Sequence, residues 1–113
     1  MLMAFTFRAK AGKEEEFERL LNNPESGLKI AKALGATRNT LFLGNGRMVR
    51  IFEFPEGAKP TTLTDLARQD PRVKEFLRSL SVVIEDGFDV ENLDTLDDFN
   101  RRASLRLAYD VRT

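Results

Sequence analysis

A sharp break between two helical segments, directly after a strand hairpin, constrains the fold of this chain most. Asp70 is a good N-cap residue and Pro71 favours the first helical position, so a helix ending at Gln69 restarts here. Beyond this point the apolar residues recur at helical spacing: Val73, Phe76, Leu77 and Leu80. The hairpin turn is predicted at Gly44-Asn45-Gly46, because Gly and Asn tolerate positive φ. A strand pair followed by helices is the order of a small α+β domain.

The sequence before the hairpin predicts one strand and two helical segments. Residues 2–10 alternate apolar and polar side chains, which is typical of a strand. A helix is predicted from Lys13, because the glutamates at 14–16 suit the positive end of a helix. Pro24 interrupts it, and a second segment over residues 27–34 ends at Gly35, a good C-cap residue. The hairpin strands follow at residues 36–43 and 48–54.

The sequence after the second hairpin strand predicts helices at both ends of a fourth strand. Thr61 or Thr62 caps the helix that ends before Asp70, and the β-branched residues 81–85 form the fourth strand. A C-terminal helix is predicted from a cap at Asp94 or Thr95, on the spacing of Leu96, Phe99, Ala103 and Leu107. The competing prediction is a strand over residues 103–111, since Leu105, Leu107 and Tyr109 also alternate.

The predicted order is βαββαβ with a C-terminal helix, that of one ferredoxin-like α+β domain over residues 1–113. Helices cover one face of such a sheet, and a face that meets water should be polar. Both faces of residues 40–43 and 48–52 are nevertheless largely apolar. A second sheet from a two-fold partner would cover the remaining face. The expectation is therefore a homodimer that closes a dimeric α+β barrel.

The composition excludes several kinds of function. Eighteen basic residues balance eighteen acidic ones with no basic block, so no nucleic-acid partner is predicted. The absence of His and Cys removes the usual general base, thiolate nucleophiles and the commonest metal ligands. The acidic stretch 85–98 lacks the spacing of a calcium loop, so neither a metal nor a cofactor is expected. Without a signal peptide or a long apolar run, the prediction is a cytoplasmic protein with no membrane association.

Arg50 and Glu53 are the candidate catalytic residues. Arg50 lies mid-strand among apolar neighbours, where an Arg is costly unless it has a partner. One interpretation is an ion pair with a carboxylate across the dimer, for which Glu53 is the local supplier despite its opposite parity. The other is an anion anchor that faces a cavity and stabilises an enolate oxygen. Glu53 would serve proton transfer if it reaches that cavity.

Six further residues are candidates for substrate contacts, and each also has a structural explanation. Cations near strand or helix ends can simply reach solvent, and aromatic side chains most often belong to the core. Phe42 and Phe52 would instead line a barrel cavity, which suits a planar aromatic ligand. The six are Arg8, Arg38, Asn39, Phe42, Phe52 and Arg68.

The whole chain resembles the SchA/CurD-like family, which accompanies aromatic polyketide pathways. The resemblance lies in the order and spacing of several short pieces: Gly12-Lys-Glu-Glu-Glu16, Leu41-Phe-Leu43, Met48-Val-Arg-Ile-Phe-Glu53, Leu66-Ala-Arg-Gln69, Leu80 with its run to Asp86, and Phe99-Asn-Arg-Arg-Ala103. It implies a dimeric α+β barrel and a place in aromatic polyketide biosynthesis, with a small aromatic or polyketide ligand and with polyketide synthase components as candidate partners.

A more distant likeness is to the tetracenomycin-type aromatic polyketide cyclases. Their hairpin run corresponds to Arg38-Asn39-Thr40-Leu41-Phe42, and their Ala-Arg before a Pro corresponds to Ala67-Arg68. Glu53 matches a Glu of those cyclases, whereas Arg50 stands where they carry a pocket His, and Asn39 replaces an Arg. The likeness implies a cofactor-free cyclase or aromatase-like accessory without His chemistry. The alternatives are a cofactor-independent monooxygenase of the same superfold and a non-catalytic dimer that binds a pathway intermediate or a partner enzyme.

Overall fold

The computed structural model describes all of residues 1–113, and its centre is a four-stranded antiparallel sheet. The sheet has the order β2-β3-β1-β4 and consists of β1 (Leu2–Arg8), β2 (Arg38–Gly44), β3 (Arg47–Glu53) and the short β4 (Ser104–Leu105). The β2–β3 turn has Asn45 at φ 54° and Gly46 at φ 69°, as a two-residue hairpin turn requires. The predicted hairpin and the predicted α+β class are therefore confirmed.

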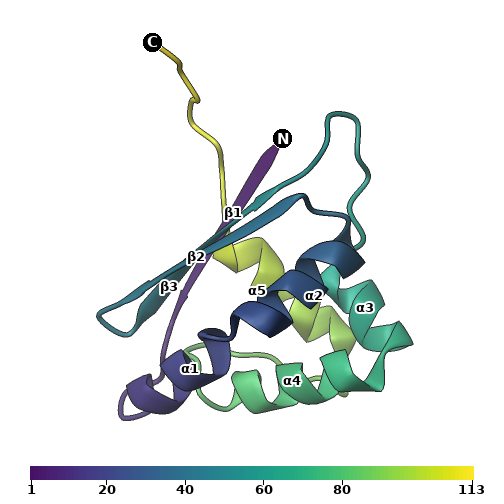
Figure 1. The fold of residues 1–113 in the computed structure, drawn as a ribbon. Coiled ribbons are helices and arrows are strands. Elements are labelled where there is room, and N and C mark those ends of the chain that lie inside the picture. Colours follow the sequence, from purple (N-terminus) through teal and green to yellow (C-terminus); the bar gives the residue numbers. More distant parts are fainter.

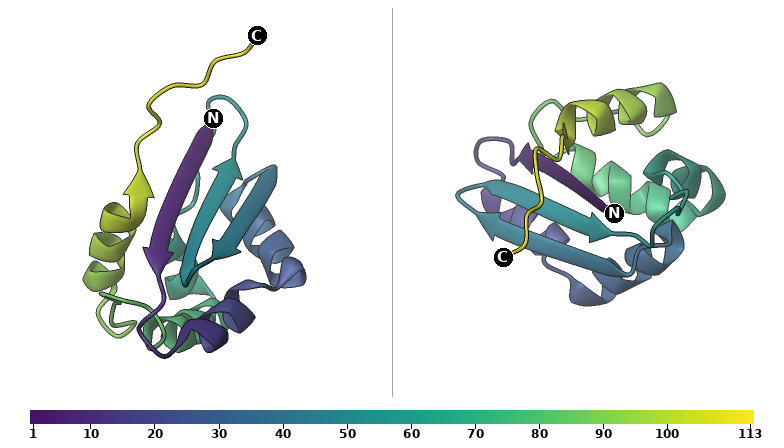
Figure 2. Two further views of the ribbon diagram at one scale, coloured as in Figure 1. Left: turned by 90° about the vertical axis from the view of Figure 1, so that its left-hand side faces the viewer. Right: turned by 90° about the horizontal axis from the view of Figure 1, so that it is seen from above.

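Five helices pack against one face of this sheet (Figures 1 and 2). They are α1 (Glu14–Leu21), α2 (Pro24–Leu34), α3 (Leu63–Gln69), α4 (Pro71–Ser81) and α5 (Leu93–Ala103). None of them combines the length and the apolar character that a bilayer crossing needs. Each of α1, α2, α4 and α5 has an apolar stripe that it buries against the core, which explains why they gather on one side.

The caps place most helix boundaries where the sequence predicts them. Thr62 accepts a hydrogen bond from the Asp65 amide, and Asp70 accepts one from the Arg72 amide, so α3 and α4 begin as expected. The second helical segment begins earlier than predicted, at Pro24 and not at Gly27, because Asn23 caps it.

Two predictions about the second half of the chain are wrong in detail. Residues 81–85 contribute only the single bridge between Ala9 and Ile84, because α4 continues to Ser81 and Val82 keeps helical dihedrals. The fourth position in the sheet belongs instead to β4, directly after α5. The C-terminal helix is capped by Asn92 and ends at Ala103, so it excludes Leu107. Residues 106–113 have no regular structure.

The strand register fixes which side chains share a face of the sheet. Arg50 lies opposite Phe5 on β1 and opposite Leu41 on β2, and the face that carries these side chains packs against the helices. We call it the inner face. Ile51, one residue further on, lies opposite Ala4 and belongs to the outer face, which no helix covers (Figure 2).

The core lies between the inner face and the helices. Its largest cluster joins β1, α1, α5 and the segment after α4, and includes Phe17, Met48, Leu80, Ile84 and Phe99. A second cluster lies near the other end of the sheet and includes Leu34, Phe52, Phe54 and Leu66. The inner face is thus mostly apolar, and a charged residue within it requires an explanation.

Candidate functional site

Arg50 is the charged residue of the inner face. Its Nη1 donates a hydrogen bond to Asn39 Oδ1 at 3.2 Å, and its guanidinium carbon lies 5.9 Å from the centre of the Phe52 ring. No carboxylate oxygen lies within the 4.0 Å that would make an ion pair, since Arg50 is in none of the salt bridges of the chain. Burial therefore lowers the pKa of Arg50 with no counter-charge to offset it. The guanidinium keeps most of its donors free for another acceptor.

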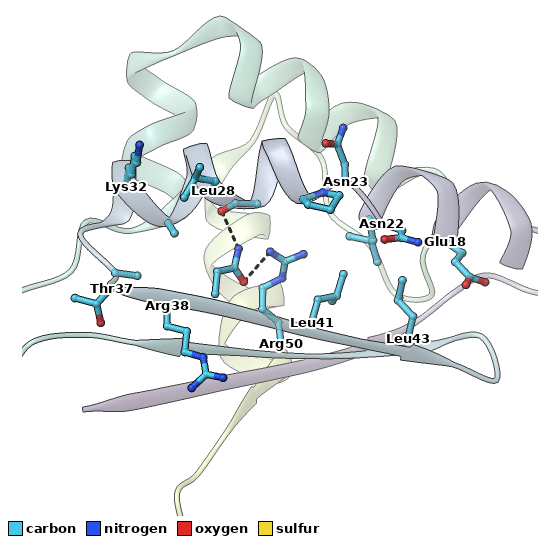
Figure 3. A pocket seen from close by; sticks show the side chains of 16 residues that line it. Glu18, Asn22, Asn23, Leu28, Lys32, Thr37, Arg38, Leu41, Leu43 and Arg50 are labelled. Atoms are coloured by element: carbon cyan, nitrogen blue, oxygen red, sulfur yellow. Dashed lines mark hydrogen bonds between the residues drawn. The ribbon is translucent and has the colours of Figure 1, made fainter.

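A short chain of hydrogen bonds holds the guanidinium in place (Figure 3). Asn39 accepts from Arg50 through Oδ1 and donates through Nδ2 to the carbonyl oxygen of Gly27 in α2, at 3.0 Å. A Cβ at residue 27 would already lie 3.4 Å from Asn39 Nδ2, so the glycine allows this close approach of helix and strand. Asn39 thus positions Arg50 from the neighbouring strand and couples it to α2.

A groove of about 750 Å³ runs between α1, α2 and β2 and reaches Arg50 from the surface (Figure 3). Its floor is apolar, with Leu41 and Leu43 of β2, while polar side chains lie along its rim. The rim residues include Glu18, Asn22, Asn23, Lys32 and Thr37. Figure 3 shows the Arg50 side chain directed from the sheet toward α2, at the centre of this groove.

A second cavity, of about 600 Å³, lies between the inner face and the helices. Its wall is dominated by aromatic and aliphatic side chains, including Phe5, Phe7, Phe52, Phe54, Phe76 and Phe99. Arg50 lines this inner cavity as well as the groove. The guanidinium therefore stands where a polar groove meets an apolar cavity, which suits a ligand with an anionic end and an aromatic body.

The inner cavity has another polar wall along α5, which sequence reasoning missed. Asp97, Asn100 and Ser104 line it at helical spacing. The Thr64 hydroxyl, which is buried, donates to Asp97 Oδ1 at 2.5 Å and so fixes one carboxylate oxygen. Asp97 falls in the acidic stretch 85–98, for which the sequence predicted no metal site, and it is an exposed residue. The signal that could have found it is the i, i+3, i+7 spacing of polar residues beside the apolar stripe of α5.

The structure brings together three of the eight residues that the sequence predicts for the site: Arg50, Asn39 and Phe52. Glu53 does not reach the cavity, because a spacing of three along a strand puts it on the outer face, where it is exposed. A carboxylate from a partner packed on the outer face would not reach Arg50 either, since Arg50 points to the helices. The ion-pair interpretation of Arg50 therefore has no acidic residue to support it.

The remaining candidates lie away from Arg50. Arg8 and Phe42 belong to the exposed outer face, and Arg38 lies at the edge of the groove with its side chain extending away from Arg50 (Figure 3). Arg68 is exposed on α3, where its Nη1 lies 3.1 Å from Asp65 Oδ1. Nor does any group of three or more carboxylates come close enough together to hold a metal ion.

Comparison with known proteins identifies no family for this chain. No protein-family model matches the chain, and no curated protein matches it significantly. Among solved structures it is similar to the crystal structure of L-rhamnose mutarotase FA22100 from Formosa agariphila, with 12% sequence identity and a TM-score of 0.48 over 74% of this chain and 79% of that one. At this level of similarity the activity of that protein says nothing about the present chain.

Proposed function

We propose that this protein binds an amphipathic aromatic anion in the inner cavity, with Arg50 holding the anionic oxygen. The observation that carries the proposal is a partly buried guanidinium with no carboxylate partner, at the junction of a polar groove and a cavity lined by Phe side chains. A phenolate, an enolate or a carboxylate on a fused-ring body satisfies both environments at once. Such molecules belong to aromatic polyketide metabolism, which is also the pathway implied by the resemblance to the SchA/CurD-like family.

The chemistry that fits this arrangement is a cofactor-free aldol cyclisation. A carboxylate removes a proton from a carbon between two ketones, and Arg50 stabilises the enolate oxygen that forms. The enolate carbon attacks a second carbonyl held nearby, and the carboxylic acid then returns its proton to the resulting alkoxide. The cavity contributes by positioning the two reacting ends of a flexible poly-β-ketone. Asp97 takes the place proposed for Glu53, because Asp97 lines the same cavity as Arg50 and Glu53 lies on the other side of the sheet.

The same proposal includes a homodimer built through the outer faces of two sheets. The outer face carries Ala4, Val49, Ile51 and Phe42 in adjacent register, with no helix over them. Phe42 is 60% exposed, so the apolar area is open to a partner. Because Arg50 and its cavity lie on the inner face, each copy would keep its own site.

A pair of matched ligands tests the binding proposal. Anthracene-9-carboxylate and anthracene-9-methanol share the ring system and differ in charge, and both are followed by their own fluorescence. The expected result is at least ten-fold tighter binding of the carboxylate, as one charge-assisted hydrogen bond of about 1.5–3 kcal/mol provides. Equal affinity for the two ligands would refute an anion anchor at Arg50.

Two alternatives remain as competing proposals, and incubation with substrates separates them. A cofactor-independent monooxygenase would convert an anthrone to a quinone under oxygen faster than autoxidation does. A non-catalytic binding protein would bind the anthracene carboxylate yet leave both a poly-β-ketone and the anthrone unchanged; the absence of His and Cys favours this alternative. Cyclised product that forms faster with protein than without it, and is lost in Asp97→Asn, supports the cyclase.

A further inference from the structure

The last eight residues of the chain continue the outer face and are all exposed. Leu105 of β4 lies opposite Ala4 of β1, so its side chain belongs to the outer face. Every second residue beyond it is apolar, and Leu107, Tyr109 and Val111 are 57%, 78% and 76% exposed. No backbone hydrogen bond connects residues 106–113 with the rest of the chain. In Figures 1 and 2 this segment leaves the sheet near the start of β1 and projects beyond the body of the molecule.

Alternation of this kind is typical of a strand with one buried face, not of a solvated tail. Arg106, Asp110 and Arg112 supply the polar side of the pattern. Within one copy the segment extends past the end of β1, because Leu105 already pairs with Ala4, only a few residues from the N-terminus. The surface that its apolar side would cover must therefore come from elsewhere.

The outer face carries charged side chains at both ends of its apolar centre. Arg8 and Arg47 lie opposite each other at one end of β1 and β3, whereas Glu53 lies opposite Arg38 of β2 at the other end; none of the four takes part in an ion pair. A second copy packed face to face with its strands antiparallel places its Glu53 opposite this pair of arginines. The same contact forms twice in a two-fold dimer, as an isologous interface requires.

We infer that, in the proposed dimer, residues 106–113 of each copy lie as an exchanged arm along the free β2 edge of the other copy's outer face. This inference rests on the proposed dimer and adds the segment that completes it. Leu107, Tyr109 and Val111 then contact the partner beside Phe42, at the margin of the surface that the two sheets bury between them.

The dimensions agree with this arrangement. The three long strands have seven residues each, and at about 3.3 Å per residue and about 4.8 Å between strands their face covers about 330 Å² in projection. A stable interface buries about 800 Å² of accessible surface per partner, so contacts beyond this small face would strengthen the dimer. An extended arm of eight residues reaches about 26 Å, enough to run along the partner's β2, and each copy both gives and receives one.

The first experiment compares matched variants of the full chain by light scattering over a dilution series. Leu107→Ser with Tyr109→Ser removes two apolar side chains of the arm, while Arg106→Ser with Arg112→Ser alters the same segment on its opposite side. The expected result is at least ten-fold weaker dimerisation for the first pair and little change for the second. Both should retain the Tm of the isolated copy, because residues 106–113 are exposed and make no backbone hydrogen bond within it.

Disulfide crosslinking shows where the arm lies. Because the chain has no native Cys, only the introduced cysteines can form the disulfide. Tyr109→Cys combined with Thr40→Cys, on the outer face, should give a disulfide-linked dimer under mild oxidation. Tyr109→Cys combined with Lys29→Cys, on the exposed side of α2, should not. A disulfide confined to one copy in the first variant, or equal crosslinking in the two, would overturn the arm.

The dimer and the exchanged arm can be refuted separately. If the full chain is a monomer at every concentration, the dimer and the arm are both wrong. If a chain truncated after Leu105 dimerises as tightly as the full chain, the sheet-to-sheet dimer stands and only the arm is overturned.

Discussion

Replacing Arg50 by Met separates a ligand anchor from a structural ion pair. Met has a similar stem length and can keep the contact with the Phe52 ring, but it removes the charge and the hydrogen bond to Asn39. If a hidden carboxylate balanced Arg50, the variant would strand a buried charge and lose about 3–5 kcal/mol of stability. The structure provides no such carboxylate, so the expected change is much smaller.

Two opposing contributions set the size of the stability change in Arg50→Met. The lost hydrogen bond to a charged donor destabilises the fold by about 1.5–3 kcal/mol at most. The removed desolvation penalty of a buried, unpaired guanidinium stabilises it by an amount of the same order, up to several kcal/mol. The free energy of unfolding of Arg50→Met should therefore remain within about 1 kcal/mol of the wild type, a shift in Tm of roughly 4 °C or less for a domain of this size.

Thermal melting followed by circular dichroism measures this directly, and Arg50→Lys is the matched control. Lys keeps the buried charge but lacks the planar fork that bonds Asn39, so it should be less stable than Met at the same position. Titration with anthracene-9-carboxylate should show a loss of ten- to a hundred-fold in affinity for Arg50→Met. A fall in the Tm of Arg50→Met of about 12 °C or more corresponds to at least 3 kcal/mol. It would refute the interpretation of Arg50 as a ligand anchor and support the structural ion pair.

Three further predictions test the fold around the site. Leu96, which is completely buried in α5, should lose about 2–5 kcal/mol of stability on replacement by Ala, measured by urea unfolding. Gly87→Ala should be destabilised by about 1–3 kcal/mol, since a Cβ there would lie 2.7 Å from the Ser81 carbonyl oxygen, and an unchanged urea midpoint would contradict this close packing. Hydrogen bonds from Arg72 hold the pKa of Asp70 below its ordinary value of 3.8, so this cap stabilises the fold above that pH and loses its contribution as the pH falls through the lower, folded-state value. Asp70→Asn should therefore melt below the wild type at pH 7, and the gap should close in acid.

Local sequence signals predicted most of the fold because they act over a few residues. The cap at Asp70, the left-handed Gly35 and the Asn45-Gly46 turn each fix a boundary without help from distant parts of the chain. The prediction of a fourth strand at residues 81–85 was wrong because the same composition suits a strand and a buried segment at the end of a helix. Val83 and Ile84 are β-branched, yet they enter the core at the end of α4, and only tertiary packing decides between these outcomes.

The parts of the candidate site that depend on alternation along one strand could be predicted from the sequence. The parts that depend on how two elements pack together could not. The alternation along β3 already placed Arg50 and Glu53 on opposite faces, and the structure has them there. That Asn39 would bond Arg50 depended on the β2–β3 register, and that Asp97 would line the cavity depended on how α5 packs. Neither relation is encoded within a single element.

Arg50 and Asn39 are the polar residues that break the apolar pattern of β2 and β3 on the inner face, and Arg50 is the charged one. A domain of this size has a total stability of about 5–15 kcal/mol, which an unpaired, partly buried cation reduces. An apolar residue of similar length would fit between Phe52 and α2 and would avoid that loss, so packing alone gives no reason for a guanidinium there. The Gly27–Asn39–Arg50 hydrogen bonds nevertheless hold it in one orientation, toward the junction of the groove and the cavity. Without a ligand, the unpaired charge of Arg50 destabilises the fold, yet the protein holds this charge at a cavity wall. An anionic ligand explains this arrangement, because the bound ligand supplies the acceptor that the chain itself lacks.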